Sequence, residues 1–171
     1  MTTKQTAAPE LVLTHEFNAP KQLVFEAFSN AAALTQWWGP AGYKNAVVSF
    51  EFKKGGLFHY KMENNGQINY GRCIFGNIQP FDLLEYTISF ADEKANPIKA
   101  PFDIQLPIEI FYTLLFTEKN GKTTISLTGK AVNPTREQME GFNAINSNMQ
   151  EGTKAMFDIL TIYLDKIQRA R

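Results

Sequence analysis

The first forty residues change from a strand period to a helix period. Apolar and polar residues alternate over residues 11–17, which is typical of a half-buried strand. Over residues 21–29 the apolar positions recur at intervals of three and four, which predicts a short amphipathic helix. A second short helix is expected to follow a cap at Ser29-Asn30 and to end at Gly39-Pro40.

The middle of the chain repeats the strand pattern, interrupted by turn residues. Asn64-Asn65-Gly66 and Asn120-Gly121 are strong signals for tight hairpins. An antiparallel meander explains these alternations most simply. The expected strands lie at about 43–51, 57–64, 67–78, 83–90, 108–117 and 123–129.

Residues 91–107 do not fit this pattern. Pro97, Pro101 and Pro107 exclude a central strand or a helix in this stretch. Loops of this length are uncommon in compact domains unless they have a function, so we expect a lid or an interface.

A long helix is predicted for the C-terminal part of the chain. Thr135 and Gln138 have the spacing of a capping box, and Asn133-Pro134 precede them. Gly152 interrupts the apolar stripe near its middle. The stripe consists of Met139, Phe142, Ile145, Met149, Met156, Leu160, Tyr163 and Ile167. Together the elements predict an α+β protein.

Composition narrows the function classes. At 171 residues the chain fits one domain, expected over residues 10–171 after a disordered or loosely ordered stretch at 1–9. Lys plus Arg and Asp plus Glu number 17 each, which argues against nucleic acid or an anionic membrane as a partner. The lone Cys73 and the lack of an apolar leader predict a cytoplasmic protein.

The two tryptophans, Trp37 and Trp38, are adjacent. Neighbouring side chains point in different directions, so one indole is expected in the core and the other in a cleft or in contact with solvent.

The order of elements resembles the helix-grip fold of the START and ring-cyclase (SRPBCC) superfamily. More closely, the chain is similar to the family named for the activator of the heat-shock protein 90 ATPase, in its stand-alone bacterial form. The resemblance implies a curved antiparallel sheet of about six to seven strands on the C-terminal helix, with two short helices after the first strand. It rests on Phe17-Asn18-Ala19-Pro20, Val24-Phe25, Trp37-Trp38-Gly39-Pro40, Gly55-Gly56, Gly71, Gly121-Lys122-Thr123 and Met149-Gln150-Glu151-Gly152.

Strand alternation and helix spacing select the candidates for lining a cavity between sheet and helix. Thr153 stands where the family often has an aromatic residue, which would enlarge the pocket there. The other lining candidates are Trp38, Phe58, Tyr60, Met62, Tyr86, Phe142 and Met149.

Two further residues complete the candidate site. Phe102 is expected to close one mouth of the cavity. Arg72 is a candidate to anchor a carboxylate or phosphate if its strand face points inward. Solvent exposure, or an ion pair with Glu85 or Glu63, is the alternative for Arg72.

The sequence predicts no catalytic residues, metal or cofactor. One cysteine and two separated histidines do not form a nucleophile triad or a metal site. His59 is expected to point away from the cavity, and His15 to be partly buried and to titrate near neutral pH.

Three functions remain open. A protein, monomer or homodimer, that binds a small hydrophobic or amphipathic molecule fits the expected cavity. Relatives in the superfamily suggest a cyclase-like or hydrolase-like enzyme, which would need a carboxylate such as Glu109 or Glu51 in the pocket. The family name suggests a stress-related regulator of a chaperone ATPase.

Overall fold

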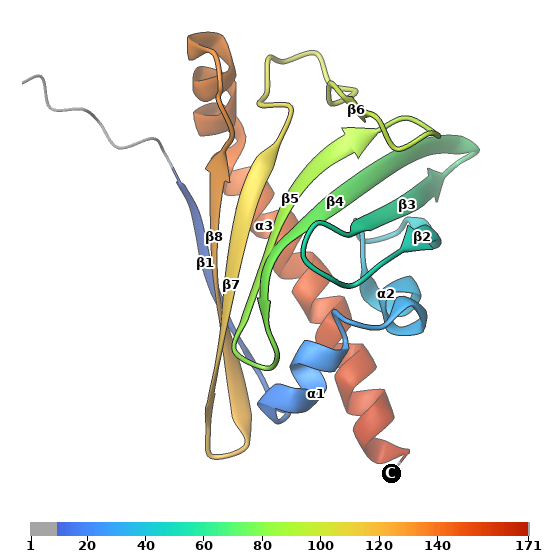
Figure 1. Cartoon of the computed structure of the whole chain (residues 1–171), viewed down its shortest axis with the longest axis vertical. Coiled ribbons are helices and arrows are strands. Elements are labelled where there is room, and N and C mark those ends of the chain that lie inside the picture. The colour runs from blue at the N-terminus through green and yellow to red at the C-terminus, as the bar shows by residue number, and fades with distance from the viewer. Residues whose placement is uncertain (1–9, 171) are drawn as a thin grey trace, which may run out of the picture.

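The computed structural model describes residues 10–170 and forms a curved sheet with one long helix across it (Figure 1). The expectation of loose order for residues 1–9 lies outside the described residues. In chain order the elements are β1 (Glu10–Phe17), α1 (Lys21–Glu26), α2 (Ala31–Trp37), β2 (Lys44–Phe50), β3 (Leu57–Asn64), β4 (Gln67–Gln79), β5 (Leu83–Ala91), β6 (Pro97–Ile98), β7 (Ile110–Lys119), β8 (Lys122–Ala131) and α3 (Arg136–Arg169).

The sheet confirms the predicted α+β helix-grip class. Its order is β1-β8-β7-β5-β4-β3-β2, and all neighbouring strands are antiparallel. The one addition to the expected strands is β6, a two-residue strand within the proline-rich stretch that pairs with the end of β5. Pro97 opens this strand and lies away from the central path of the sheet, where a missing N–H is tolerated.

Local signals set the ends of the elements as expected. The Asn30 side chain accepts hydrogen bonds from the N–H groups of Ala32 and Ala33 at the start of α2. Thr135 and Gln138 form the complete capping box at the start of α3. Asn120 and Gly121 take positive φ angles of 53° and 76°, which a tight hairpin turn requires.

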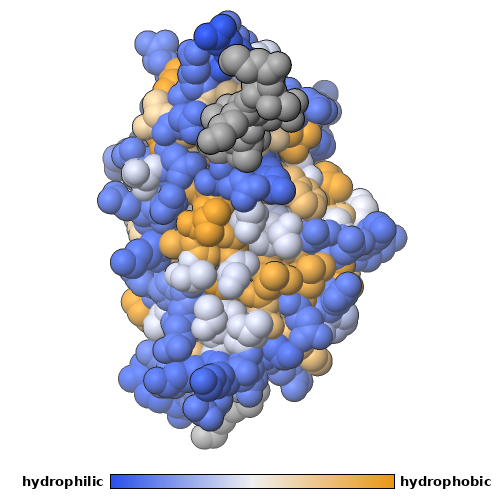
Figure 2. Space-filling model, turned by 90° about the vertical axis from the view of Figure 1, so that its left-hand side faces the viewer, coloured by the Kyte–Doolittle hydropathy of each residue, from blue (hydrophilic) through white to orange (hydrophobic). Residues whose placement is uncertain are grey.

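The long helix covers only one face of the sheet. Figure 1 shows α3 crossing that face, with α1 and α2 beside its C-terminal half. On the opposite face Val12 of β1 and Leu115 of β7 are exposed. Figure 2 views the side on which β1 and β8 lie and shows apolar atoms in the middle of that surface.

Candidate functional site

A cavity of about 340 Å³ lies between the sheet and the N-terminal half of α3. Strands β3, β4, β5, β7 and β8 form its floor, α3 its roof, and the 100–108 loop one side. Eight of the ten predicted lining residues lie in its wall: Trp38, Tyr60, Met62, Tyr86, Phe102, Phe142, Met149 and Thr153. Their role in ligand binding stays a prediction.

The adjacent tryptophans divide as predicted. Trp37 is fully buried, and its Nε1–H donates a 3.0 Å hydrogen bond to the carbonyl oxygen of Ala27. Trp38 lines the cavity and packs edge-on against Tyr60 and Tyr86, with ring centroids 5.8 and 5.9 Å away. The end of α2 at Trp37 turns the second indole toward the sheet.

Two tyrosines of the cavity lie over glycines on neighbouring strands. Tyr60 of β3 is directly opposite Gly71 of β4, and Tyr112 of β7 is directly opposite Gly129 of β8. A Cβ atom on Gly129 would lie 2.6 Å from Cε1 of Tyr112, and one on Gly71 would overlap the Tyr60 ring. The glycines therefore let the tyrosine rings lie close to the sheet.

Burial keeps the polar groups near the cavity floor neutral. Desolvation raises the pKa of Tyr60, Tyr86 and Tyr112 above the usual value for a phenol. Desolvation also raises the pKa of the Cys73 thiol, which faces the same side of the sheet from β4. At neutral pH these groups are therefore hydroxyls and a thiol, without charge.

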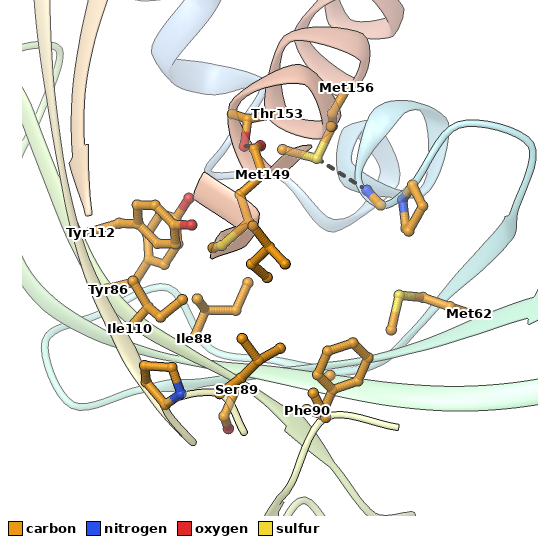
Figure 3. A pocket seen from close by; sticks show the side chains of 18 of the residues that line it. Met62, Tyr86, Ile88, Ser89, Phe90, Ile110, Tyr112, Met149, Thr153 and Met156 are labelled. Carbon is orange, nitrogen blue, oxygen red and sulfur yellow. Dashed lines mark hydrogen bonds between the residues drawn. The ribbon is translucent and has the colours of Figure 1, made fainter. Parts of the chain in front are cut away.

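The roof of the cavity is built from flexible and small side chains of α3. Figure 3 shows Met149, Thr153 and Met156 on the side that faces the sheet. The backbone N–H of Gly39 donates to Sδ of Met156 at 3.3 Å, which ties α3 to the end of α2. Methionine adapts to ligands of varied shape, so this roof suits an apolar ligand.

The loop after β6 forms the rim of the cavity. Phe102 packs edge-on against Phe90 with ring centroids 5.8 Å apart, yet 58% of it is exposed. Gln105 approaches α3 closely at Gly141, where a Cβ atom would overlap its carbonyl oxygen. Phe102 therefore stands at the mouth on a loop that is held against the helix.

Arg72 does not line the cavity, and this part of the prediction is wrong. On β4 the inward residues are Gly71, Cys73 and Phe75, while Arg72 points to the outer face of the sheet. The prediction grouped Arg72 with Ile78, but the register shifts between Phe75 and Ile78 and changes the alternation.

On the outer face Arg72 holds down the segment that follows β5. Its guanidinium donates to the carbonyl oxygen of Ala95 at 3.1 Å and lies 3.5 Å from the Glu109 carboxylate. Next to it, the Nε2 atom of His59 is 3.0 Å from the carbonyl oxygen of Asp92. His59 thus points away from the cavity, as predicted, although the segment buries it.

Phe58 is also outside the cavity wall. It is fully buried between Trp38 and Phe50, with ring centroids 5.4 and 5.5 Å away. Trp38 and Tyr60 line the cavity and both contact the Phe58 ring, so Phe58 supports the wall from behind.

Sequence reasoning missed several lining residues. The most important of them is Tyr112. The alternation of Ile110, Tyr112, Leu114 and Phe116 along β7 is a sequence signal that could have identified it. The other missed side chains include Ile88, Phe90, Leu127, Ile145 and Met156.

The carboxylates named for an enzyme lie elsewhere. Glu109 pairs with Arg72 on the outer face, and Glu51 is exposed beside Lys53. Within residues 10–170 no group of three or more His, Cys, Asp or Glu side chains is placed to hold a metal ion. No helix in this range is long and apolar enough to span a membrane.

The fold and its cavity define a helix-grip protein of the SRPBCC superfamily. Residues 18–165 match the model of the family described as activator of Hsp90 ATPase homolog 1-like protein. The chain therefore belongs to this family.

Solved structures of bacterial proteins share the fold. A protein from Arthrobacter aurescens is 24% identical, with a TM-score of 0.77 over 93% of this chain and 87% of that one. A protein from Staphylococcus epidermidis is 25% identical, with a TM-score of 0.75 over 97% and 94% of the two chains. A search of curated protein sequences gives no significant match.

Proposed function

We propose that this protein binds one small hydrophobic or amphipathic molecule in the cavity between the sheet and α3. The observation that carries the proposal is the cavity of about 340 Å³, which lies within the size range of small-molecule sites. Its wall consists of aliphatic, aromatic and neutral polar residues.

Burial of apolar surface would supply the binding free energy. At about 25 cal/mol per Å², removing about 300 Å² of ligand and wall surface from water contributes about 7.5 kcal/mol. The cost of association offsets part of this, so we expect affinity in the micromolar range or weaker.

The same geometry supports binding without a catalysed reaction. The ionisable side chains of the wall are tyrosines whose pKa is raised by burial, so they exchange no proton near neutral pH. We also propose a cytoplasmic location, which the buried free thiol of Cys73 supports.

Two measurements test the proposal. Purified protein is extracted into organic solvent, and mass spectrometry is expected to find a small apolar molecule that a control protein purified alongside lacks. Delipidated protein is then titrated with naphthalene by equilibrium dialysis, and saturable binding of one molecule per chain is expected. Uptake that never saturates would contradict the proposal.

A further inference from the structure

Two tyrosine hydroxyls lie together at one end of a mainly apolar cavity. Tyr86 of β5 and Tyr112 of β7 are directly opposite each other in the sheet, with ring centroids 5.6 Å apart. Only 4% of Tyr86 and 8% of Tyr112 is exposed. Figure 3 shows both hydroxyls pointing into the cavity, toward the side where Met149 of α3 lies.

Neither hydroxyl is used by the protein itself. Among residues 10–170 the hydroxyls of Tyr86 and Tyr112 make no hydrogen bond to another side chain or to the backbone, and only burial and neighbouring ionisable groups raise their pKa. Neither oxygen is among the sealed polar atoms without a partner, so each is reached from the cavity. The two O–H groups are therefore free to bind a ligand.

The positions of the two rings are fixed. Gly129 lies directly below the Tyr112 ring, and Trp38 packs against Tyr86 with centroids 5.9 Å apart. A hydroxyl on a fixed ring loses little conformational freedom when it binds a partner. The pair is thus preorganised for an atom that accepts hydrogen bonds from both.

A pure hydrocarbon can occupy the cavity, but it does not satisfy the hydroxyls at this end. It would displace water from both hydroxyls and leave two buried donors without partners, which costs free energy. A carboxylate is also a poor match, because no cationic side chain is among the wall residues that would surround it. An uncharged oxygen with two lone pairs satisfies both donors at once.

We propose that Tyr86 and Tyr112 together bind the carbonyl oxygen of a neutral, otherwise apolar ligand, such as an aromatic or alicyclic ketone or ester. This inference rests on the proposed function and names the ligand class for the same cavity. Desolvation keeps both phenols protonated, so both remain donors throughout the physiological pH range.

Equilibrium dialysis with three probes of one skeleton tests the inference. The probes are 2-acetylnaphthalene, 2-isopropenylnaphthalene, in which CH₂ replaces the carbonyl oxygen, and 2-naphthoate. The wild-type protein is expected to bind the ketone at least about 10-fold more tightly than the alkene. The carboxylate is expected to bind most weakly.

The double variant Tyr86→Phe/Tyr112→Phe keeps both rings and removes both hydroxyls. It is expected to abolish the preference for the ketone and to leave alkene binding equal or tighter. Tyr70→Phe is the matched control, because Tyr70 packs against His59 at the outer face, and it should keep the preference.

The outcomes separate the two claims. Equal binding of ketone and alkene by the wild type, or a preference that survives in the double variant, would overturn the inference and leave the proposed function standing. Tightest binding of the carboxylate would also overturn the inference. No saturable binding of any probe would overturn both.

Discussion

The space between α3 and the sheet is solid in one half and hollow in the other. In the half beside α1 and the C-terminal part of α3, five aromatic residues fill the space: Phe17, Phe28, Trp37, Phe116 and Phe157. Phe28 packs edge-on against Trp37 at 4.7 Å and Phe17 against Phe157 at 5.6 Å, measured between ring centroids. We call this set the aromatic half, and the cavity with its wall the hollow half.

The difference shows how one architecture provides both stability and a site. Edge-to-face aromatic contacts and fully buried Leu160 and Leu164 of α3 close the aromatic half. In the hollow half α3 presents Gly152 and Thr153, and a Cβ atom on Gly152 would meet nothing within 4 Å. Stability should therefore depend on the first half and ligand binding on the second.

The largest expected effect is on stability in the aromatic half. Trp37→Ala removes a fully buried indole and its hydrogen bond to Ala27, and should lower the free energy of unfolding by about 3–5 kcal/mol. Met149→Ala in the hollow half should cost only about 1 kcal/mol, because one side of Met149 already faces open space. Urea unfolding of both variants measures the two losses in free energy of unfolding. Equal losses would contradict the difference in stability between the aromatic half and the hollow half.

Glycine substitutions sharpen the comparison on a smaller scale. Gly129→Ala places a methyl group against the Tyr112 ring and should cost about 1–3 kcal/mol. Gly152→Ala meets open space within a helix and should stabilise by about 0.5–1 kcal/mol. Thermal unfolding gives both values, and a destabilising Gly152→Ala would show that the helix is not open there.

A third prediction concerns the rim. Phe102→Ala should leave the free energy of unfolding within about 0.5 kcal/mol of the wild type, because most of the ring is already exposed. Ligand dissociation should become several-fold faster, since Phe102 stands at the mouth. Stopped-flow release of bound naphthalene measures the rate, and an unchanged rate would place the route of entry elsewhere.

The smallest expected effect is pH dependence in the aromatic half. Desolvation lowers the pKa of His15, which lies against Phe17 and Phe157, although Asp158 opposes the shift and Lys154 adds to it. Below pH 6.5 the unfolded chain therefore binds more protons at His15 than the folded chain does. The contribution of His15 to the free energy of unfolding is full above pH 6.5 and is lost as pH falls.

The variant His15→Gln removes this contribution. The loss of stability between pH 7.5 and pH 5 should be smaller in His15→Gln, by well under about 1 kcal/mol after solvent screening. Urea unfolding at several pH values measures it. A steeper pH dependence in the variant would mean that His15 has a raised pKa.

Much of the fold could be predicted because its signals are local. The Asn30 cap, the Thr135 capping box and the Asn120-Gly121 turn each act within a few residues, and the structure has all three. The period of two along β3 and β5 likewise predicted that Tyr60, Met62 and Tyr86 share the inner face.

The wrong assignments depended on longer-range geometry. The register shift in β4 spans Gly76, a residue type that often marks a bulge, and overlooking it placed Arg72 on the same face as Ile78. Phe58 was assigned to the correct face, but only the three-dimensional packing shows that it lies against Trp38 and Tyr60 and outside the cavity wall. The pairing of Tyr86 with Tyr112 depends on the order of β5 and β7 in the sheet.

The most direct test of the central claim is the dissociation constant of naphthalene in two tryptophan variants of α3. Thr153→Trp adds an indole inside the cavity, whereas Ile162→Trp adds one at a position that is 67% exposed on the same helix. By equilibrium dialysis, Thr153→Trp should weaken binding at least about 10-fold, and Ile162→Trp should leave it unchanged. Equal affinities in both variants and the wild type would show that the ligand binds outside this cavity.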